Sequence, residues 1–297
     1  MTDENKDTDN CFPIRELSAR TQVNTVTLRA WERRYGLLKP QRTAKGHRLY
    51  SEQDVAIIEK VLALVARGVP LGKVKPLLKG DTVESPENDE TENWQTSISA
   101  LVTAVEVFSV SKTEHLIQQF FANYPIRVTH ERLIEPVFTV LAQRNDEGAA
   151  MGFMENELIR YTLMRLSAKV GKKKHVHTVT LIAGNQAPMW CLALIALELT
   201  DLKFSVYLLT RSFSVETGIE LAKNLKGDFT VFYQDGIWKD KEKKLLDAAL
   251  HDNERIFLCG TAPVLSQFDH ENRVFGDMKS CIEGLLKLQE TKSFGLN

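Results

Sequence analysis

Cysteines are few in this 297-residue chain, and they stand far apart. Cys11, Cys191, Cys259 and Cys281 form no Cys-x-x-Cys pair. This spacing argues against a zinc site or a disulfide framework and fits a protein of the reducing cytoplasm. No apolar run approaches the roughly 20 residues that a membrane-spanning helix needs. The acidic N-terminus MTDENKDTDN has none of the features of a secretory signal and is expected to form a disordered tail over residues 1–11.

Recognisable catalytic constellations are lacking as well. The sequence shows no Ser/His/Asp set, no Cys/His pair and no phosphate-binding glycine loop. His175 and His177 are the one close pair of histidines. Because further ligands are not found nearby, we expect solvated loop side chains rather than a metal site. The sequence therefore predicts a protein that is not an enzyme and that holds no metal.

Net charge is only −1 over the whole chain, but its distribution is uneven. Residues 12–80 contain 14 Lys/Arg and 5 Asp/Glu, a net of +9. Residues 81–93, DTVESPENDETEN, contain six acids and no base, which is the composition of a flexible acidic linker. Positive charge concentrated in one domain is the electrostatic footprint of phosphate binding, although a charge run alone is more often a solvated face.

Residues 24–50, NTVTLRAWERRYGLLKPQRTAKGHRLY, give that charge a structural context. Asn24 or Thr25 can cap a short helix, and Gly36 can end it in the left-handed conformation. A basic hairpin follows, with its tip expected at Lys45-Gly46. A capped helix before a basic hairpin is the layout of a winged helix-turn-helix, in which the helix enters the major groove and the wing grips the flanking backbone.

The stretch resembles the DNA-binding domain of MerR-type transcription regulators over roughly residues 12–79. The resemblance rests on Thr27-Leu28-Arg29, Trp31-Glu32-Arg33, Gly36-Leu37-Leu38, Pro40-x-Arg42 and Gly46-His47-Arg48-Leu49-Tyr50. For Tyr50, packing against the next helix remains an equal alternative, and His47 can serve either DNA or the wing. The residues expected to contact DNA are Thr25, Thr27, Arg29, Arg33, Tyr35, Arg42, Lys45, His47, Arg48 and Tyr50.

The rest of the chain divides into a helical and an alternating part. Residues 94–171 are predicted to form a four-helix bundle, with Leu101, Val105 and Phe108 on one face. In residues 172–297, strands at 177–184, 204–209, 229–233 and 255–260 alternate with helices. This alternation predicts a Rossmann-like α/β domain whose parallel sheet is covered on both faces. The fold class is thus multidomain, with a winged helix-turn-helix at 12–80.

A bundle and an α/β domain behind such a head resemble the cobalamin-binding photoreceptor regulators of the MerR family. The resemblance implies a Glu/Asp-x-His-x-x-Gly motif after the first strand, but Gly184 to Cys191 supplies neither the histidine nor the later glycine. In the Trp-x9-Glu-His motif of the bundle, Glu155 is matched while Asn156 replaces the histidine, and Asn145 stands near the expected tryptophan. The arrangement looks most like MlrA-type regulators of biofilm matrix genes, with a degenerate cobalamin-type domain.

The sequence therefore predicts a DNA-binding transcription regulator of the bacterial cytoplasm. Its partners would be a near-palindromic promoter duplex, a second copy of the chain and regulatory proteins that contact residues 94–297. No cofactor is expected. The alternative is a cobalamin-dependent sensor with non-standard ligation, for which Cys191 is a conceivable ligand; Met189 and Trp190 line a residual pocket or pack on the sheet.

Overall fold

The computed structural model describes residues 11–43, 45–80, 94–144, 148–169, 177–270 and 272–293. They belong to two compact units, Met1–Glu157 and Leu158–Asn297, which divide within one helix. The expected acidic linker at 81–93, the expected tail except Cys11, and the expected boundary at 171 lie outside the described residues. Each unit is considered separately below.

The first unit begins with a small helix-turn-helix domain. Its strands form a three-stranded antiparallel sheet in the order β1-β3-β2. Helix α1 begins at Ile14, because Phe12 and Pro13 pair with Tyr50 and Leu49 in the sheet. The elements are β1 (Phe12–Pro13), α1 (Ile14–Thr21), α2 (Thr25–Ala30), the π-helical turn η1 (Trp31–Tyr35), β2 (Gln41–Arg42) and β3 (Arg48–Tyr50).

Two further helices complete this domain, α3 (Glu52–Ala66) and α4 (Leu71–Leu78). Helix α3 begins with a capping box, in which Ser51 and Asp54 satisfy each other's free backbone N–H groups. Ile58, Val61 and Val65 recur at helical spacing and are buried. These three residues form the buried face of α3, and α1 packs against this helix.

The helical bundle begins at Trp94 and is confirmed as predominantly helical. One departure concerns Phe108, which we placed on the face of Leu101 and Val105. Helix α5 ends at Glu106, so Phe108 lies in the following turn with a φ of 50° and is 51% exposed. The elements are α5 (Trp94–Glu106), α6 (Val110–Asn123), α7 (Ile126–Thr129), the π-helical turn η3 (His130–Ile134), α8 (Glu135–Leu141) and α9 (Ala149–Lys169).

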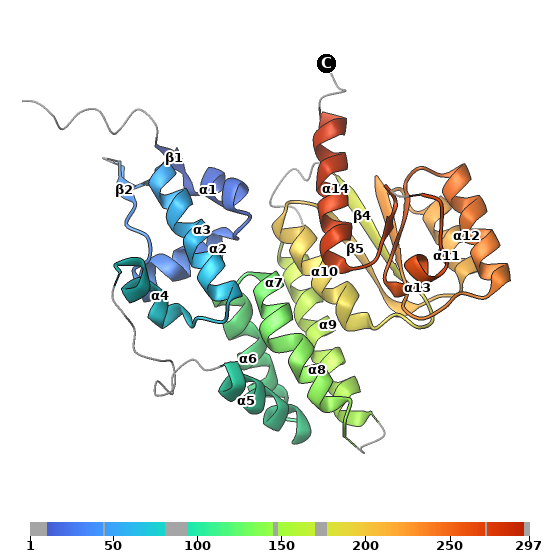
Figure 1. The fold of residues 1–297 in the computed structure, drawn as a ribbon, viewed down its shortest axis with the longest axis horizontal. Helices are drawn as coiled ribbons and strands as arrows, with labels where there is room; N and C mark the ends of the chain where they lie inside the picture. Colours follow the sequence, from blue (N-terminus) through green and yellow to red (C-terminus); the bar gives the residue numbers. More distant parts are fainter. Residues whose placement is uncertain are drawn as a thin grey trace, which may run out of the picture. The chain divides into compact units, whose positions relative to one another are not determined.

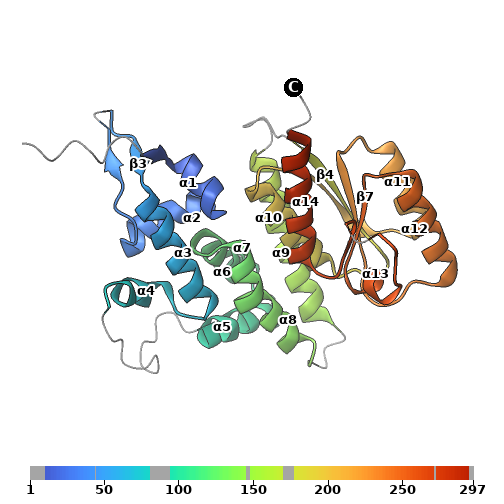
Figure 2. The same ribbon diagram turned by 45° about the horizontal axis from the view of Figure 1, so that its top comes forward.

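The second unit is a parallel α/β domain, as predicted. Its five strands stand in the order β5-β4-β6-β7-β8, and every neighbouring pair is parallel. Helices α10 and α14 cover one face of the sheet, and α11 and α12 cover the other (Figures 1 and 2). The elements are β4 (Thr178–Ala183), α10 (Met189–Asp201), β5 (Ser205–Ser212), α11 (Val215–Asn224), β6 (Phe229–Tyr233), α12 (Asp240–Asp252), β7 (Ile256–Cys259), α13 (Thr261–Leu265), β8 (Val274–Phe275) and α14 (Met278–Ser293).

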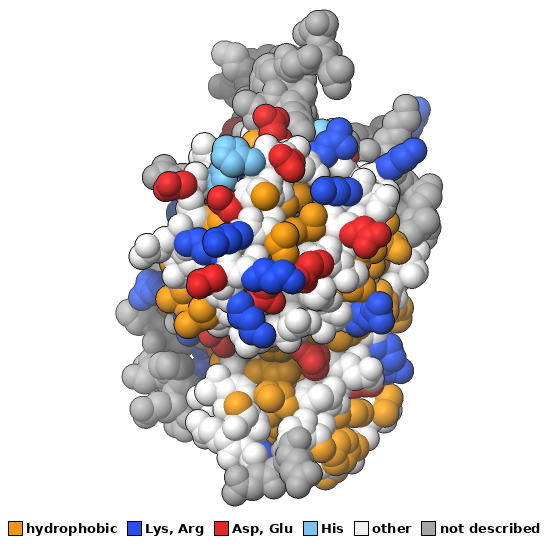
Figure 3. Space-filling view, turned by 90° about the vertical axis from the view of Figure 1, so that its right-hand side faces the viewer, with side chains coloured by type: hydrophobic (Ala, Val, Ile, Leu, Met, Phe, Trp, Pro, Cys, Tyr) orange, Lys and Arg blue, Asp and Glu red, His pale blue; other side chains and the backbone are white. Residues whose placement is uncertain are grey.

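Burial explains why the central strands read as continuous apolar runs. All five residues of β6, from Phe229 to Tyr233, are buried because helices pack on both faces. The edge strand β5 is more open, and Tyr207 is 54% exposed. On the face formed around α11 and α12, acidic and basic side chains are interspersed (Figure 3). This face therefore lacks the single-sign charge that marks a nucleic-acid surface.

Candidate nucleic-acid interface

The recognition helix, defined as α2 with its continuation η1, separates a buried face from an exposed one. The Oδ1 atom of Asn24 accepts a hydrogen bond from the Val26 backbone N–H at 2.9 Å, which confirms the predicted cap. Leu28 and Trp31 are fully buried, whereas Arg29 and Arg33 are exposed. The helix ends at Gly36, whose φ of 58° is the left-handed conformation expected there. Two arginines are thus presented together on the surface.

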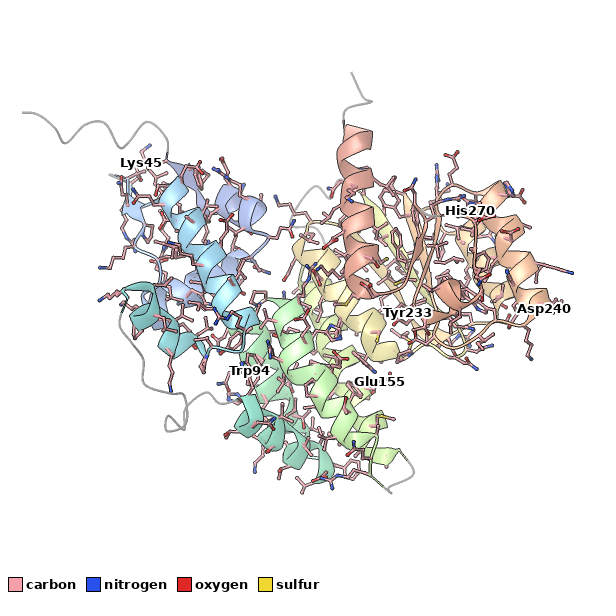
Figure 4. The ribbon with its side chains drawn as sticks, viewed as in Figure 1. Lys45, Trp94, Glu155, Tyr233, Asp240 and His270 are labelled. Atoms are coloured by element: carbon pink, nitrogen blue, oxygen red, sulfur yellow. The ribbon has the colours of Figure 1, made fainter. Side chains whose placement is uncertain are left out.

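The wing places further cations on the same domain. The Thr43 N–H donates to His47 O at 2.9 Å and the Gly46 N–H donates to Thr43 O at 2.8 Å, so the predicted turn is confirmed. Gly46 has a φ of 79°, a backbone conformation that residues with a side chain rarely adopt. Lys45 lies at the outer end of the wing (Figure 4) and, like Arg42 and His47, is exposed.

Glu32 joins the wing to the recognition helix. Its carboxylate accepts hydrogen bonds from Arg48 Nε at 3.0 and 2.7 Å, and Arg42 Nη2 lies 4.0 Å away. The side chain of Glu32 is 13% exposed, so this pairing is partly shielded from water. Hydrogen bonding to Glu32 raises the pKa of Arg48 above its usual value. Arg48, which we expected to contact DNA, is therefore paired with Glu32 within the DNA-binding domain.

Two of the expected DNA contacts lie in the core instead. Tyr50 is fully buried and Thr27 is 2% exposed, so neither side chain is accessible to a duplex in this conformation. For Tyr50 the alternative of packing inside the domain is therefore the correct one, whereas the expected exposure of Thr27 is wrong, because Thr27 lies beside Leu28 on the buried face of the helix. The Tyr50 hydroxyl is buried without a hydrogen-bond partner, and burial raises the pKa of Tyr50 to about 12. Thr25 and Tyr35 are half-buried.

A contact that the sequence did not indicate joins the recognition helix to the bundle. Trp31 Nε1 donates to the backbone carbonyl of Asn123 at 2.7 Å, and Arg34 Nη1 donates to Asn123 Oδ1 at 3.0 Å. Nearby in the same unit, Arg132 donates to the carbonyl oxygen of Ala66. Asn123 itself is 3% exposed. The DNA-binding domain therefore packs directly on α6, and no sequence motif marks Asn123.

In the second unit, loops meet at the carboxyl ends of the strands, where ligands of parallel α/β domains bind. The side chain of Gln234 packs against Gly184 so closely that a Cβ there would overlap its amide, and Gln186 packs against Gly236 in the same way. Gln234 is 5% exposed. Two amide side chains occupy this edge, and neither is a strong axial ligand for cobalt. These residues do not fit a cobalamin.

Other candidate ligands do not converge either. In the described part of the chain, no three His, Cys, Asp or Glu side chains are grouped as a metal site. The expectation of a solvated side chain is wrong for His177, which is only 12% exposed, with its Nδ1 3.8 Å from Asp228 Oδ2 and its ring beside Phe229. His175 and Asn145 lie outside the described residues. Tyr233 lies at the carboxyl end of β6 (Figure 4), and burial raises its pKa. Among the described helices, none is long and apolar enough to cross a membrane.

The fold and the exposed cations define a winged helix-turn-helix DNA-binding protein. Residues 12–81 match the model of the MerR HTH family regulatory proteins. The chain is 31% identical over 175 residues to the HTH-type transcriptional regulator MlrA of Salmonella typhimurium, covering 59% of this chain and 69% of that protein. It therefore belongs to the MerR family, and it is a DNA-binding transcription regulator whose second unit is a parallel α/β domain.

Two further similarities have lower sequence identity. The HTH-type transcriptional repressor CarH of Myxococcus xanthus is 25% identical over 169 residues, which cover 52% of this chain and 56% of CarH. Among solved structures, the monomethylamine corrinoid protein of Methanosarcina barkeri is similar with a TM-score of 0.46 and 11% identity. That match covers 65% of this chain and 99% of the corrinoid protein.

Proposed function

We propose that the protein activates promoters by binding a near-palindromic duplex as a homodimer. The supporting observation is the shared exposure of Arg29 and Arg33 on the recognition helix, next to a wing that carries Arg42 and Lys45. An arginine fork can bind the N7 and O6 atoms of guanine or straddle a phosphate. One short helix reads few base pairs, and two-fold symmetry doubles the sequence that is read.

The test compares arginines on two surfaces of one domain. Arg29→Ala should weaken binding to a duplex selected from random sequence by roughly 1–3 kcal/mol and relax specificity at one position. Arg15 is exposed on α1, outside the proposed interface, and serves as the matched control. Fluorescence anisotropy at several salt concentrations gives both affinity and salt slope. Equal losses in Arg29→Ala and Arg15→Ala would contradict the assigned interface. A genome-wide map of bound DNA would supply the operators.

The dimer interface is proposed to lie in residues 94–297. MerR-type resemblance implies a long dimerisation helix directly after the DNA-binding domain, but α4 ends at Leu78 after eight residues. Sedimentation of a 94–297 fragment at micromolar concentration should therefore show a dimer. The fragment needs a cooperative melting transition as its control for folding. A folded fragment that sediments only as a monomer would remove this part of the proposal.

The α/β domain is proposed as a docking or sensing module in a cytoplasmic regulator, without catalytic activity of its own. Two observations support this proposal. The relative MlrA is a transcriptional regulator, and the side chains of Gln234 and Gln186 pack at the carboxyl ends of the strands. By similarity to MlrA-type proteins, the target genes would include those for the biofilm matrix. The competing function is cobalamin sensing through another ligand, for which the half-buried Cys191 is the candidate.

A further inference from the structure

A cavity of about 420 Å³ lies within the DNA-binding domain, between the base of the wing and helices α3 and α4. Four lysines line it: Lys39, Lys60, Lys75 and Lys79. In the described part of the chain, no hydrogen bond or ion pair engages any of their ammonium groups. Lysines gathered around one cavity without partners create a positive potential that favours an anionic occupant.

The one acidic side chain that lines the cavity does not offset these charges fully. Asp54 Oδ2 already accepts a hydrogen bond from the Ser51 backbone N–H at 2.9 Å, as part of the capping box of α3. Four lysines against one aspartate leave a net of +3 among the lining residues. The N-terminal turn of the 15-residue helix α3 faces the same space and adds its partial positive charge.

The wall of the cavity also has an apolar part. Leu37, Leu49 and Ile57 contribute to the lining beside the lysines. The volume falls in the range of about 300–1,000 Å³ that is typical of small-molecule sites, which combine apolar walls with a few polar groups. A bare inorganic ion would leave the apolar wall without contact, and duplex DNA would bring only its backbone.

We propose that this cavity binds a small organic anion with an apolar ring and a phosphate or similar acidic group. The cavity also connects to the DNA-reading surface. The Lys75 ammonium lies against Gly36, where a Cβ would approach Nζ to 2.8 Å, and Gly36 ends the recognition helix. An anion that draws Lys75 away from Gly36 changes the packing at that end, so occupancy and DNA binding are coupled. This proposal goes beyond the DNA-binding function.

The experiment uses the full chain and 1-naphthyl phosphate, with 1-naphthol and inorganic phosphate as controls. Cys11 lines the cavity and is half-buried, Cys191 in the α/β domain is half-buried and outside the cavity, and Cys259 and Cys281 are buried. Protection of Cys11 from alkylation, measured by mass spectrometry, therefore localises binding. We expect 1-naphthyl phosphate to protect Cys11 at concentrations at least tenfold lower than either control, because only it supplies both the ring and the charge.

Variants separate the cavity from the rest of the surface. Lys60→Gln and Lys75→Gln should each raise the protective concentration about tenfold, since each removes one charge-assisted contact. Lys73→Gln is the matched control, because Lys73 lies on α4 near Lys75 but does not line the cavity. Lys60 is exposed on α3, so its substitution leaves the fold intact even if that of Lys75 does not.

DNA is the other source of phosphate, and its binding to the same variants distinguishes the two. A small-molecule site predicts that Lys60→Gln binds a selected duplex within twofold of the unmodified chain. It also predicts that 1-naphthyl phosphate shifts the DNA affinity of the unmodified chain and not that of the variant. Two results would overturn the proposal. One is equal protection by inorganic phosphate, and the other is a salt slope that falls by about one in Lys60→Gln, which would assign the lysine to the DNA backbone.

Discussion

At the residue scale, Tyr50 shows how one side chain can have two opposite assignments. It closes the Gly46-to-Tyr50 motif, so the resemblance placed it at DNA, yet it is fully buried with an unpartnered hydroxyl. Tyr50→Phe removes that hydroxyl while keeping the ring. We expect unchanged DNA affinity and a free energy of unfolding that is equal or higher by about 1 kcal/mol, because a buried unpaired polar group is lost. Chemical denaturation and anisotropy measure both, and a clear loss of affinity would restore Tyr50 as a contact.

The pKa of Tyr50 gives the same residue a pH signature. The hydroxyl is neutral in both states below about pH 10, and only the unfolded chain ionises readily between pH 10 and 12. Stability from this group is therefore complete below pH 10 and declines as pH rises toward 12, by at most about 2–3 kcal/mol. The difference in unfolding free energy between Tyr50→Phe and the unmodified chain should widen across that interval. A constant difference would mean that Tyr50 is accessible to solvent.

Glu32 is expected to position the wing through Arg48. Glu32→Gln and Arg48→Ala should both weaken DNA binding, and their effects should not add, because each variant breaks the same pair. A double-mutant cycle measured by anisotropy should give a coupling free energy of roughly 0.5–2 kcal/mol. The salt slope adds a second criterion: it should fall in Arg48→Ala and not in Glu32→Gln. Strict additivity would assign the two residues to separate tasks.

At the element scale, the recognition helix depends on the bundle. Trp31 is the one tryptophan within residues 12–80, and it is fully buried with its Nε1 bonded to Asn123. We expect a 12–80 fragment to fold and bind DNA more weakly than the full chain. The fluorescence emission of Trp31 in this fragment should be red-shifted relative to that of a buried indole, because removal of α6 exposes its ring to water. Asn123→Ala in the full chain is the control, since it removes the Arg34 contact but keeps the backbone acceptor of Trp31. An unshifted spectrum with full affinity would show that the bundle contact is dispensable.

Sequence patterns located elements better than contacts between elements. The strand at 229–233 was placed at its observed bounds because the β6 side chains are buried on both faces, and the cap at Asn24 followed from short-range chemistry. Strand β8 was not predicted, because its two half-buried residues are too few to show an alternation of apolar and polar side chains. The Trp31–Asn123 contact and the lysine-lined cavity join residues far apart in sequence, and periodicity holds no information about such pairs.

At the scale of the whole molecule, the fold and the lining residues lead to different expectations. The resemblance of the sequence to cobalamin-binding regulators implies a cofactor in the parallel α/β domain that follows the bundle. A histidine nitrogen would serve as a strong axial ligand for cobalt, and a carboxylate would orient its ring. In this chain, Ala187 and Pro188 stand in the loop after β4, and Gln234 fills the space beside Gly184.

We therefore expect no cobalamin binding and no response to light. Titration of the full chain with adenosylcobalamin and methylcobalamin in the dark should leave the absorbance spectra of the cobalamins and the sedimentation coefficient of the protein unchanged. Cys191→Ala is the matched variant, because Cys191 is half-buried and its thiol is the substitute ligand proposed near that loop. A stoichiometric spectral shift that Cys191→Ala abolishes would identify thiolate ligation and make this chain a cobalamin sensor. A shift that survives the substitution would show that the packing of Gln234 opens to admit the cofactor, against the expectation from its burial.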